Sequence, residues 1–322
     1  MSRVDEALRR ALEQGPNREP VLPAELSSQV SDLDINTLAQ EAFPIEMREH
    51  RRPPRKPAAE NPPSLEPLRT DVPAAPGATS VELFERVNVA LAEKIVIDHN
   101  MAPVCREQYR RLAAILHHSQ LSTGLAVVMV SSAVPGEGKT LTCSNLALTF
   151  SESYHRNVLL IDADLRRPAL HSVFRVDNAS GLSDGLAALQ EHKMAMRQVS
   201  TRLAILPAGK ATSDPMARLT SDRMRRLLQE ARGAFDWVII DTPPVALLPD
   251  AHLLSSMTDG ALLVVKAGST PHYLVKRAVD ALGQDRILGA VLNRSTTSTN
   301  AGGYTYYQNY YYGAPPETAV KS

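Results

Sequence analysis

The chain has 322 residues, of which 43% are hydrophobic, and its 35 basic and 35 acidic residues give a formal net charge of zero. This length and composition predict one large α/β core with extensions, and the balanced charge gives no reason to expect a nucleic-acid partner. The two cysteines, Cys105 and Cys143, lack the spacing of a metal or redox site. Reduced thiols of this kind are typical of a cytosolic chain.

No segment reaches the roughly 18 consecutive apolar residues that cross a bilayer. The charged, amphipathic start MSRVDEALRRALEQ also lacks the apolar centre of a signal peptide. We therefore expect any work at a membrane to be done at its surface or through a partner.

Residues 1–80 predict an extension of the folded domain. A capping-box pattern that begins at Ser2 and a one-sided apolar repeat predict a short amphipathic helix over residues 2–14, which either docks on a partner or packs on its own domain. Eight of the 23 prolines fall between Pro53 and Pro76, so the rest of the extension is predicted to be a largely disordered linker. A basic cluster in this linker is interpreted as a solvated run of charge in preference to a membrane contact. Its members are Arg48, Arg51, Arg52, Arg55 and Lys56.

Residues 81–296 predict the folded domain. Apolar periodicity returns at residues 81–100, which we expect to pack against the edge of the domain, and from residue 104 helical and extended segments alternate. This alternation predicts an α/β fold with a mostly parallel sheet flanked by helices. The predicted helices are 104–118, 138–153, 221–232 and 271–284, and the predicted strands are 125–131, 157–162, 203–206, 236–241, 260–266 and 287–292.

A glycine-rich segment, AVPGEGKT at residues 133–140, lies between a predicted strand and a predicted helix. Its glycines allow backbone N–H groups to surround phosphate oxygens, and the start of the helix adds the positive end of its dipole. Lys139 is placed to reach the β- and γ-phosphates and Thr140 to bind magnesium. The segment therefore predicts a nucleoside triphosphate site. The residues expected to hold the nucleotide are Pro135, Gly136, Glu137, Gly138, Lys139, Thr140 and Leu141.

Two further strands end in aspartate, in LLIDAD at residues 159–164 and in VIIDTPP at residues 238–244. Ligands of parallel α/β sheets bind at the carboxyl ends of the strands, and a hydrated magnesium ion prefers hard oxygen ligands. We therefore expect Asp241 to hold magnesium through water, and Asp162 and Asp164 to share metal positioning and the handling of a proton. The alternative for each aspartate taken alone is a helix cap.

Six of the nine tyrosines lie within residues 304–312, in a predicted flexible tail at 297–322. They follow neither the period of a strand nor that of a helix, which argues against a place in the core. They begin 11 residues and end 19 residues beyond Asn293, an extended reach of roughly 35 to 65 Å. Such a tail can present a phenol to an active site, with self-association as the alternative. These tyrosines are Tyr304, Tyr306, Tyr307, Tyr310, Tyr311 and Tyr312.

The motifs AVPGEGKT, LLIDADLRRP and VIIDTPP, together with the tyrosine-rich tail, resemble the bacterial tyrosine kinases (BY-kinases), the cytoplasmic autokinases of exopolysaccharide and capsule export. The resemblance covers about residues 104–312, and the ordered set of three nucleotide motifs is specific to the wider family of deviant P-loop ATPases. By this resemblance the motif residues are Lys139 and Thr140 in Walker A, Asp162 and Asp164 in A′, and Asp241 in Walker B. Asn293 looks like the asparagine that recognises the base, with an ordinary strand-ending turn residue as the alternative.

The resemblance implies a tyrosine autokinase that depends on ATP and Mg2+, with Lys139, Asp162 and Asp164 as catalytic residues and Thr140, Asp162 and Asp241 as metal-binding residues. It implies phosphorylation of the tail between subunits, which regulates polymerisation or export of a polysaccharide. It also implies a homo-oligomer, a separate transmembrane polysaccharide co-polymerase as activator, a cognate tyrosine phosphatase, and a cytoplasmic location peripheral to the inner membrane.

Two departures from related patterns bear on this interpretation. Partitioning and division-site ATPases of the same superfamily carry a signature lysine where this chain has Val134, which argues against a non-kinase ATPase switch. The kinases carry a helix motif, Glu-x-x-Arg-x-x-Arg, that builds their ring of subunits. Glu107 and Arg110 match it, but Ala113 replaces the second arginine and Arg111 lies one helical step away. A non-kinase switch and a scaffold that binds nucleotide without hydrolysis are the alternative classes.

Overall fold

The structure, a computed structural model, describes residues 87–98, 100–188, 194–245 and 251–295. The predicted helix at 2–14, the linker and the tyrosine tail lie outside the described residues. Seven strands form one sheet in the order β3-β4-β2-β5-β1-β6-β7, and every neighbouring pair is parallel except β3 with β4. The predicted α/β fold with a mostly parallel sheet is thereby confirmed. The strands are β1 (Val127–Ser132), β2 (Val158–Asp162), β3 (Arg197–Ser200), β4 (Leu203–Leu206), β5 (Trp237–Asp241), β6 (Gly260–Lys266) and β7 (Ile287–Asn293).

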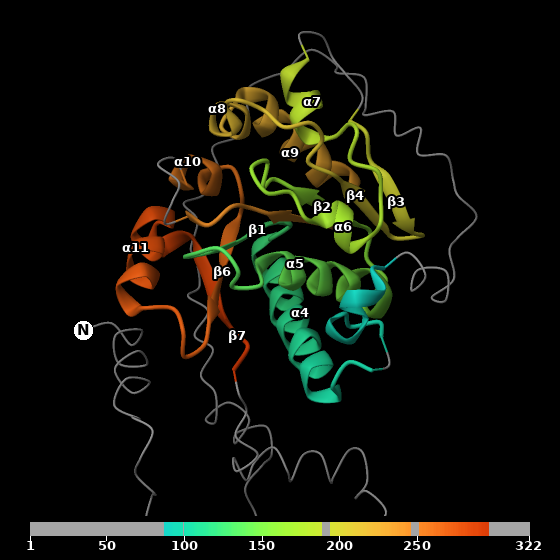
Figure 1. The fold of residues 1–322 in the computed structure, drawn as a ribbon, viewed down its shortest axis with the longest axis vertical. Helices are drawn as coiled ribbons and strands as arrows, with labels where there is room; N and C mark the ends of the chain where they lie inside the picture. The colour runs from blue at the N-terminus through green and yellow to red at the C-terminus, as the bar shows by residue number, and fades with distance from the viewer. Residues whose placement is uncertain (1–86, 99, 189–193, 246–250, 296–322) are drawn as a thin grey trace, which may run out of the picture. The chain divides into compact units, whose positions relative to one another are not determined.

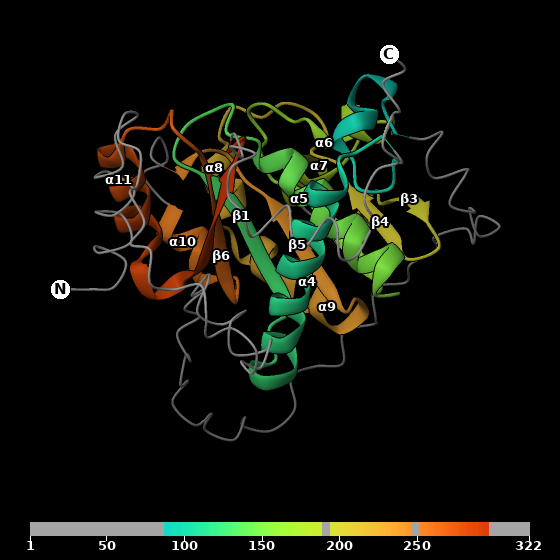
Figure 2. The ribbon, with the colours of Figure 1, turned by 90° about the horizontal axis from the view of Figure 1, so that it is seen from below.

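Helices cover both faces of the sheet, so the central strands β1, β2 and β5 are buried along their whole length. Strands of this kind require nearly continuous apolar sequence, which is what VVMV, VLLI and WVII supply. Figure 1 and Figure 2 both place α11 at the β6 end of the sheet, with β3 and β4 at the opposite end. One helical layer contains α4 (Pro103–Thr123), α5 (Lys139–Leu148) and α6 (Leu170–Val173). The other contains α7 (Leu182–Ala187), α8 (Pro215–Leu219), α9 (Asp222–Ala234), α10 (Ala251–Ser256) and α11 (His272–Leu282).

The described part of the segment before α4, residues 87–98, packs against α5. It contains a 3-10 turn, Val89–Lys94, followed by the buried Ile95 and Val96. Asn145 of α5 holds this segment, because its Oδ1 accepts the N–H of Val96 and its Nδ2 donates to Lys94 O, both at 2.9 Å. In the described ranges, no helix combines the length and apolar character that a membrane span requires.

Several elements differ from their predicted extents. The predicted helix 104–118 continues to Thr123 and ends at Gly124, whose φ of 71° stops the helix in a left-handed turn. The predicted helix 138–153 is α-helical only to Leu148 and finishes as a π-helical turn, Thr149–Ser153. Strand β3 and the helices α6, α7, α8 and α10 were not predicted. The four helices have six residues or fewer, too short for a helical period to emerge, and β3 (RQVS) lacks an apolar run.

Candidate active site

The phosphate loop leaves β1 in the middle of the sheet and enters α5 at Lys139. Gly136 and Gly138 have φ values of 82° and 95°, a left-handed conformation that glycine adopts without steric strain. Gly138 also lies against Asn293, so that an added Cβ atom would stand 2.0 Å from Asn293 Nδ2. The shape of the loop therefore depends on glycine, and the predicted base-binding Asn293 lies beside it.

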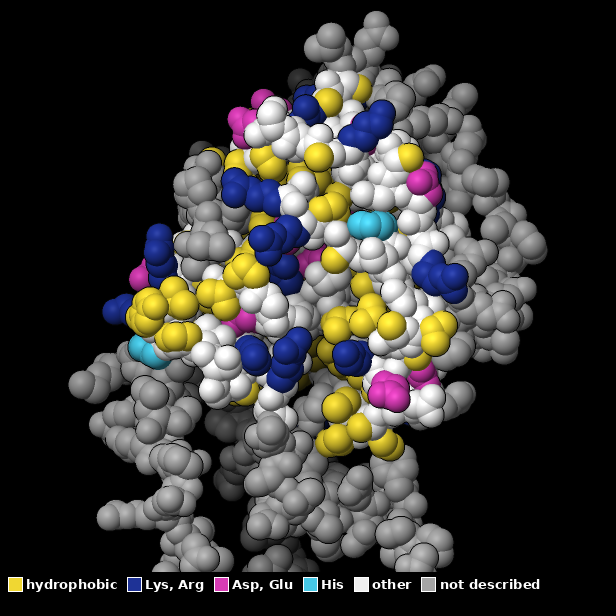
Figure 3. All heavy atoms as spheres, viewed as in Figure 1, with side chains coloured by type: hydrophobic (Ala, Val, Ile, Leu, Met, Phe, Trp, Pro, Cys, Tyr) yellow, Lys and Arg dark blue, Asp and Glu magenta, His cyan; other side chains and the backbone are white. Residues whose placement is uncertain are grey.

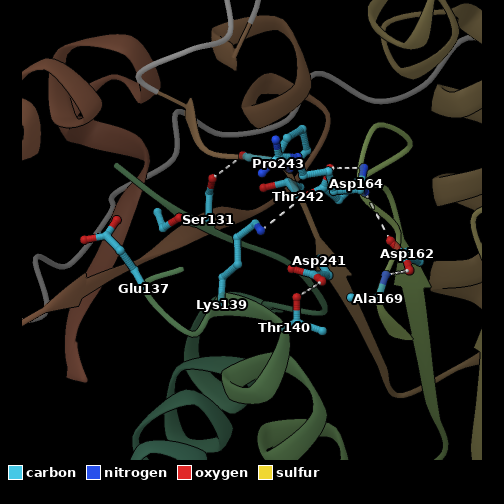
Figure 4. A network of polar contacts seen from close by, with 12 residues as sticks. Ser131, Glu137, Lys139, Thr140, Asp162, Asp164, Ala169, Asp241, Thr242 and Pro243 are labelled. Carbon is cyan, nitrogen blue, oxygen red and sulfur yellow. Dashed lines mark hydrogen bonds and ion pairs between the residues drawn. The ribbon is translucent and has the colours of Figure 1, made fainter. Parts of the chain in front are cut away.

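Lys139 points from the start of α5 toward the acidic strand ends (Figure 4). Its Nζ lies 3.1 Å from Asp164 Oδ2, and only 12% of the Lys139 side chain and 6% of the Asp164 side chain are exposed. Burial opposes the charge of Lys139, but the carboxylates of Asp241 and Asp164 outweigh burial and raise the pKa of the lysine. Lys139 is therefore a cation at neutral pH, ready to bind an anionic ligand.

Asp241 ends β5 beside the loop and is fully buried. Its Oδ2 accepts a hydrogen bond of 2.6 Å from Thr140 Oγ1, whereas its Oδ1 is buried without a hydrogen-bond partner in the described part of the chain. A buried carboxylate oxygen without a partner is costly, and a hydrated cation would satisfy it. Thr140 and Asp241 thus fit magnesium, which binds through few protein oxygens and keeps several waters. Within the described ranges, no three His, Cys, Asp or Glu side chains gather into a metal cage.

Asp162 and Asp164 have different partners although they are two residues apart. Asp162 Oδ2 accepts the N–H groups of Ala169 and Leu170 at 3.0 Å each, and its Oδ1 accepts the N–H of Asp164 at 3.2 Å. Asp162 therefore holds the turn between β2 and α6, while Asp164 faces Lys139. Burial and the charge of Asp241 both raise the pKa of Asp162.

Glu137 occupies the phosphate loop, but its side chain lies on the opposite side from Lys139 (Figure 4). Its Oε2 accepts the N–H of Val134 at 2.8 Å, and its Oε1 accepts the N–H of Lys266 at 3.1 Å and the hydroxyl of Thr270. Its backbone oxygen accepts Asn293 Nδ2 at 2.7 Å. The motif predicts Glu137 in the site but does not reveal its side-chain contacts with Lys266 and Thr270, because these partners lie 129 and 133 residues further along the chain.

The remaining predicted residues are the two cysteines, the ring motif on α4 and the tail tyrosines. Cys143 is buried and Cys105 is exposed, and both are free; burial raises the pKa of the Cys143 thiol well above its usual value. Glu107 and Arg110 form an exposed pair on α4 with 3.6 Å between Oε2 and Nη1. Ala113 of the same helix is fully buried, so the third position of the ring motif faces the core. The six tail tyrosines lie outside the described residues.

These observations define the class of protein. A glycine-rich loop after the central strand of a parallel sheet, a buried lysine at the start of the next helix, and aspartates at the ends of two neighbouring strands together form a P-loop nucleotide site. The chemistry of that site still requires comparison with known proteins, because many functions share this fold.

One family model and two curated relatives match the part of the chain that contains this site. The family model described as cellulose biosynthesis protein BcsQ matches residues 125–297. Tyrosine-protein kinase YwqD of Bacillus subtilis is 36% identical over 204 residues, which span 62% of this chain and 85% of that protein. Tyrosine-protein kinase etk of Escherichia coli is 35% identical over 197 residues, which span 60% of this chain and 27% of that protein.

Solved structures extend this agreement to three dimensions. The kinase domain of Escherichia coli tyrosine kinase ETK is similar with a TM-score of 0.54 and 34% identity, over 60% of this chain and 78% of that chain. The chimerical protein CapA2B2 is similar with a TM-score of 0.58 and 26% identity, over 63% of this chain and 90% of that chain. The chain belongs to the BcsQ family. It also belongs to the bacterial tyrosine-protein kinases. It is therefore a protein-tyrosine kinase with a P-loop ATP-binding fold.

Proposed function

We propose that this kinase transfers the γ-phosphoryl group of ATP, with Mg2+, to tyrosines of its own tail. The observation that supports this most directly is the buried pair of Lys139 and Asp164 beside Asp241, because it brings a cation and two carboxylates to one point of the phosphate loop. Its acceptors would be Tyr304, Tyr306, Tyr307, Tyr310, Tyr311 and Tyr312.

Each residue of the site has a distinct role in this proposal. Lys139 binds the β- and γ-phosphates, and in doing so it exchanges its ion pair with Asp164 for one with the nucleotide. The freed Asp164 carboxylate then orients the acceptor phenol, whose unperturbed pKa is about 10, and accepts its proton. Asp162 fixes the Asp164 backbone through the 3.2 Å hydrogen bond between them. Magnesium, bound by Thr140 and Asp241, would neutralise developing charge on the phosphoryl oxygens.

Positive side chains surround the carboxyl edge of the sheet. Arg166 and Arg167 after β2 and Lys210 after β4 are exposed, and Figure 3 shows Lys and Arg side chains spread over the face that is seen in Figure 1. A positive rim attracts a triphosphate to the site.

The length of the tail allows transfer between subunits, which the resemblance to the bacterial tyrosine kinases favours. The acceptor tyrosines begin 11 residues beyond Asn293, so an extended tail reaches roughly 35 Å or more, to its own site or to that of a neighbouring subunit. Each phosphotyrosine adds about 1.5 to 2 negative charges. Repulsion by the acidic strand ends would then release the modified tail and weaken the homo-oligomer.

The proposed setting follows from the family. We infer that the kinase works at the cytoplasmic face of the inner membrane, bound to a separate transmembrane polysaccharide co-polymerase that activates it, and that a cognate tyrosine phosphatase reverses the modification. The outcome would be regulated polymerisation or export of an exopolysaccharide or capsule.

A mixing experiment tests the proposal. A Lys139→Met subunit with an intact tail is mixed with an active subunit that lacks residues 297–322, in the presence of ATP, magnesium and the activator. Intact-mass measurement is expected to show increments of about 80 Da, one phosphoryl group each, on the Lys139→Met subunit. An unmodified Lys139→Met tail alongside a modified wild-type tail would rule out transfer between subunits. An unmodified wild-type tail would refute the proposed activity altogether.

A further inference from the structure

Glu137 has a buried carboxylate that the transfer step does not use. Glu137 is 1% exposed, and both of its carboxylate oxygens accept hydrogen bonds from within the protein. Oε2 accepts the N–H of Val134, and Oε1 accepts the N–H of Lys266 and the hydroxyl of Thr270. Hydrogen bonds to an ionised acceptor are stronger than those between neutral groups. The carboxylate therefore fastens the phosphate loop to the turn Lys266–Thr270 that follows β6.

The strand order gives this turn a place in the nucleotide site. Strand β1 lies between β5 and β6, so Asp164 and Asp241 follow strands on one side of the phosphate loop, while the turn after β6 and the end of β7 lie on the other. Figure 4 shows the same division, with Glu137 on the side of the loop away from the aspartates. A nucleotide whose γ-phosphoryl end faced Lys139 and Asp164 would extend its nucleoside end toward β6 and β7.

Asn293, at the end of β7, lies on the same side of the phosphate loop as the turn after β6. Its Nδ2 donates to Glu137 O at 2.7 Å, and its Oδ1 accepts the N–H of Arg294 at 2.8 Å. One N–H of the amide and one lone pair of its oxygen are left for a ligand. We name Asn293 and the turn Lys266–Thr270 the nucleoside side of the site. Glu137 contacts the turn through its side chain and Asn293 through its backbone oxygen.

We propose that Glu137 is a positioning residue, which sets the affinity for the base and ribose of the nucleotide by holding the nucleoside side against the phosphate loop. This inference rests on the proposed nucleotide site. It separates two contributions to binding: the phosphate loop recognises the triphosphate, and the contact between Glu137 and Thr270 adds recognition of the nucleoside.

Two ligands separate these contributions in the full-length protein. Inorganic tripolyphosphate with magnesium measures the phosphate loop, and ATP with magnesium measures the whole site. Thr270→Val removes the hydroxyl that donates a hydrogen bond to Glu137, and it changes no residue of the phosphate loop. The variant is therefore expected to weaken ATP binding about tenfold. It should leave tripolyphosphate binding within about twofold of wild type. Thr270→Ser keeps the hydroxyl and is expected to restore ATP binding.

Glu137→Gln completes the comparison. An amide cannot accept hydrogen bonds at both ends, so this variant is expected to weaken binding of both ligands. Adding Thr270→Val to Glu137→Gln should cause no further loss for ATP, because the two changes break the same contact. Glu152→Gln is the matched control. The Glu152 carboxylate accepts hydrogen bonds from the hydroxyls of Ser151 and Ser200, so this variant should leave the affinities for ATP and tripolyphosphate unchanged.

Three results would overturn the inference: a Thr270→Val variant with normal ATP affinity, equal losses for ATP and tripolyphosphate in that variant, or additive losses in the double variant. A purely structural role for Glu137 predicts equal losses. If wild-type protein bound neither ligand, the proposed nucleotide site would itself be refuted, together with this inference. Melting temperatures measured without ligand identify any variant that fails to fold, and Thr270→Ala, which also lacks the hydroxyl, then carries the comparison.

Discussion

Replacing Gly138 by alanine tests how closely the phosphate loop and β7 fit together. At this position the backbone has a φ of 95°, and a Cβ atom would stand 2.0 Å from Asn293 Nδ2. The substitution therefore adds two costs at once. The backbone is strained, and the Asn293 side chain must move away from Glu137 O, its 2.7 Å partner.

The magnitude follows from these two contributions. A side chain in the left-handed region costs about 1–2 kcal/mol, and the loss of one neutral hydrogen bond costs about 1 kcal/mol. We expect Gly138→Ala to lower the free energy of unfolding by about 2–3 kcal/mol, which corresponds to a fall of roughly 5–10 °C in melting temperature.

Gly124 provides a matched control at the end of α4. Its φ is 71° and nothing lies within 4 Å of its added Cβ atom, so Gly124→Ala should cost only the backbone strain, about 1–2 kcal/mol. The gain from restricting the unfolded chain is the same in both variants and cancels in the comparison.

Urea unfolding without nucleotide measures the difference. The Gly138→Ala/Asn293→Ala pair should be less destabilising than the sum of its single changes by about 1 kcal/mol, because either change alone removes the same hydrogen bond. Equal costs for Gly124→Ala and Gly138→Ala, or additive costs in the pair, would refute the reasoning.

Three further predictions concern the aspartates. Asp164→Asn should slow tail phosphorylation about 100-fold or more, whereas Asp162→Asn should lower the free energy of unfolding by about 1–2 kcal/mol; urea unfolding and a rate assay distinguish them, and interchangeable effects would contradict their assigned partners. Removal of magnesium with EDTA should abolish tail phosphorylation, and Asp241→Asn should reduce the rise in melting temperature that magnesium causes in wild type. Burial opposes the charge of Asp259, but hydrogen bonds from Val127 and Arg232 outweigh it and lower its pKa. Its stabilisation is therefore complete above the ordinary aspartate pKa of about 3.9 and is lost as the pH falls below that value. Acid unfolding curves should be shallower for Asp259→Asn, and identical curves would show that this carboxylate contributes nothing.

The central part of the fold could be predicted because its residues are constrained on both faces. Strands β1, β2 and β5 lie between two helical layers, so their sequences are apolar without interruption and their positions are predicted to within two residues. Strand β3 has the sequence RQVS and pairs antiparallel with β4 at the edge of the sheet. An edge strand with a polar face does not need an apolar run, which is why periodicity did not reveal it.

In the candidate site, the sequence predicts which residues come together but not how their side chains are oriented. Spacing alone placed Lys139 near Asp162 and Asp164, but could not say which aspartate faces the lysine. The answer depends on the turn after β2, where the N–H groups of Ala169 and Leu170 bind Asp162. Alternation of side chains along a strand no longer applies once the strand has ended at Asp162.

The direction of β7 decides at which end of the sheet the chain after Asn293 begins. Because β7 runs parallel to β6, Asn293 lies at the rim of the sheet where Lys139 and Asp241 meet. A final strand of opposite sense would have released the following polypeptide at the far rim, roughly 23 Å away for seven residues. Under the proposed autophosphorylation, the polarity of this edge strand lets the chain leave the sheet beside the site at which the tail tyrosines would react.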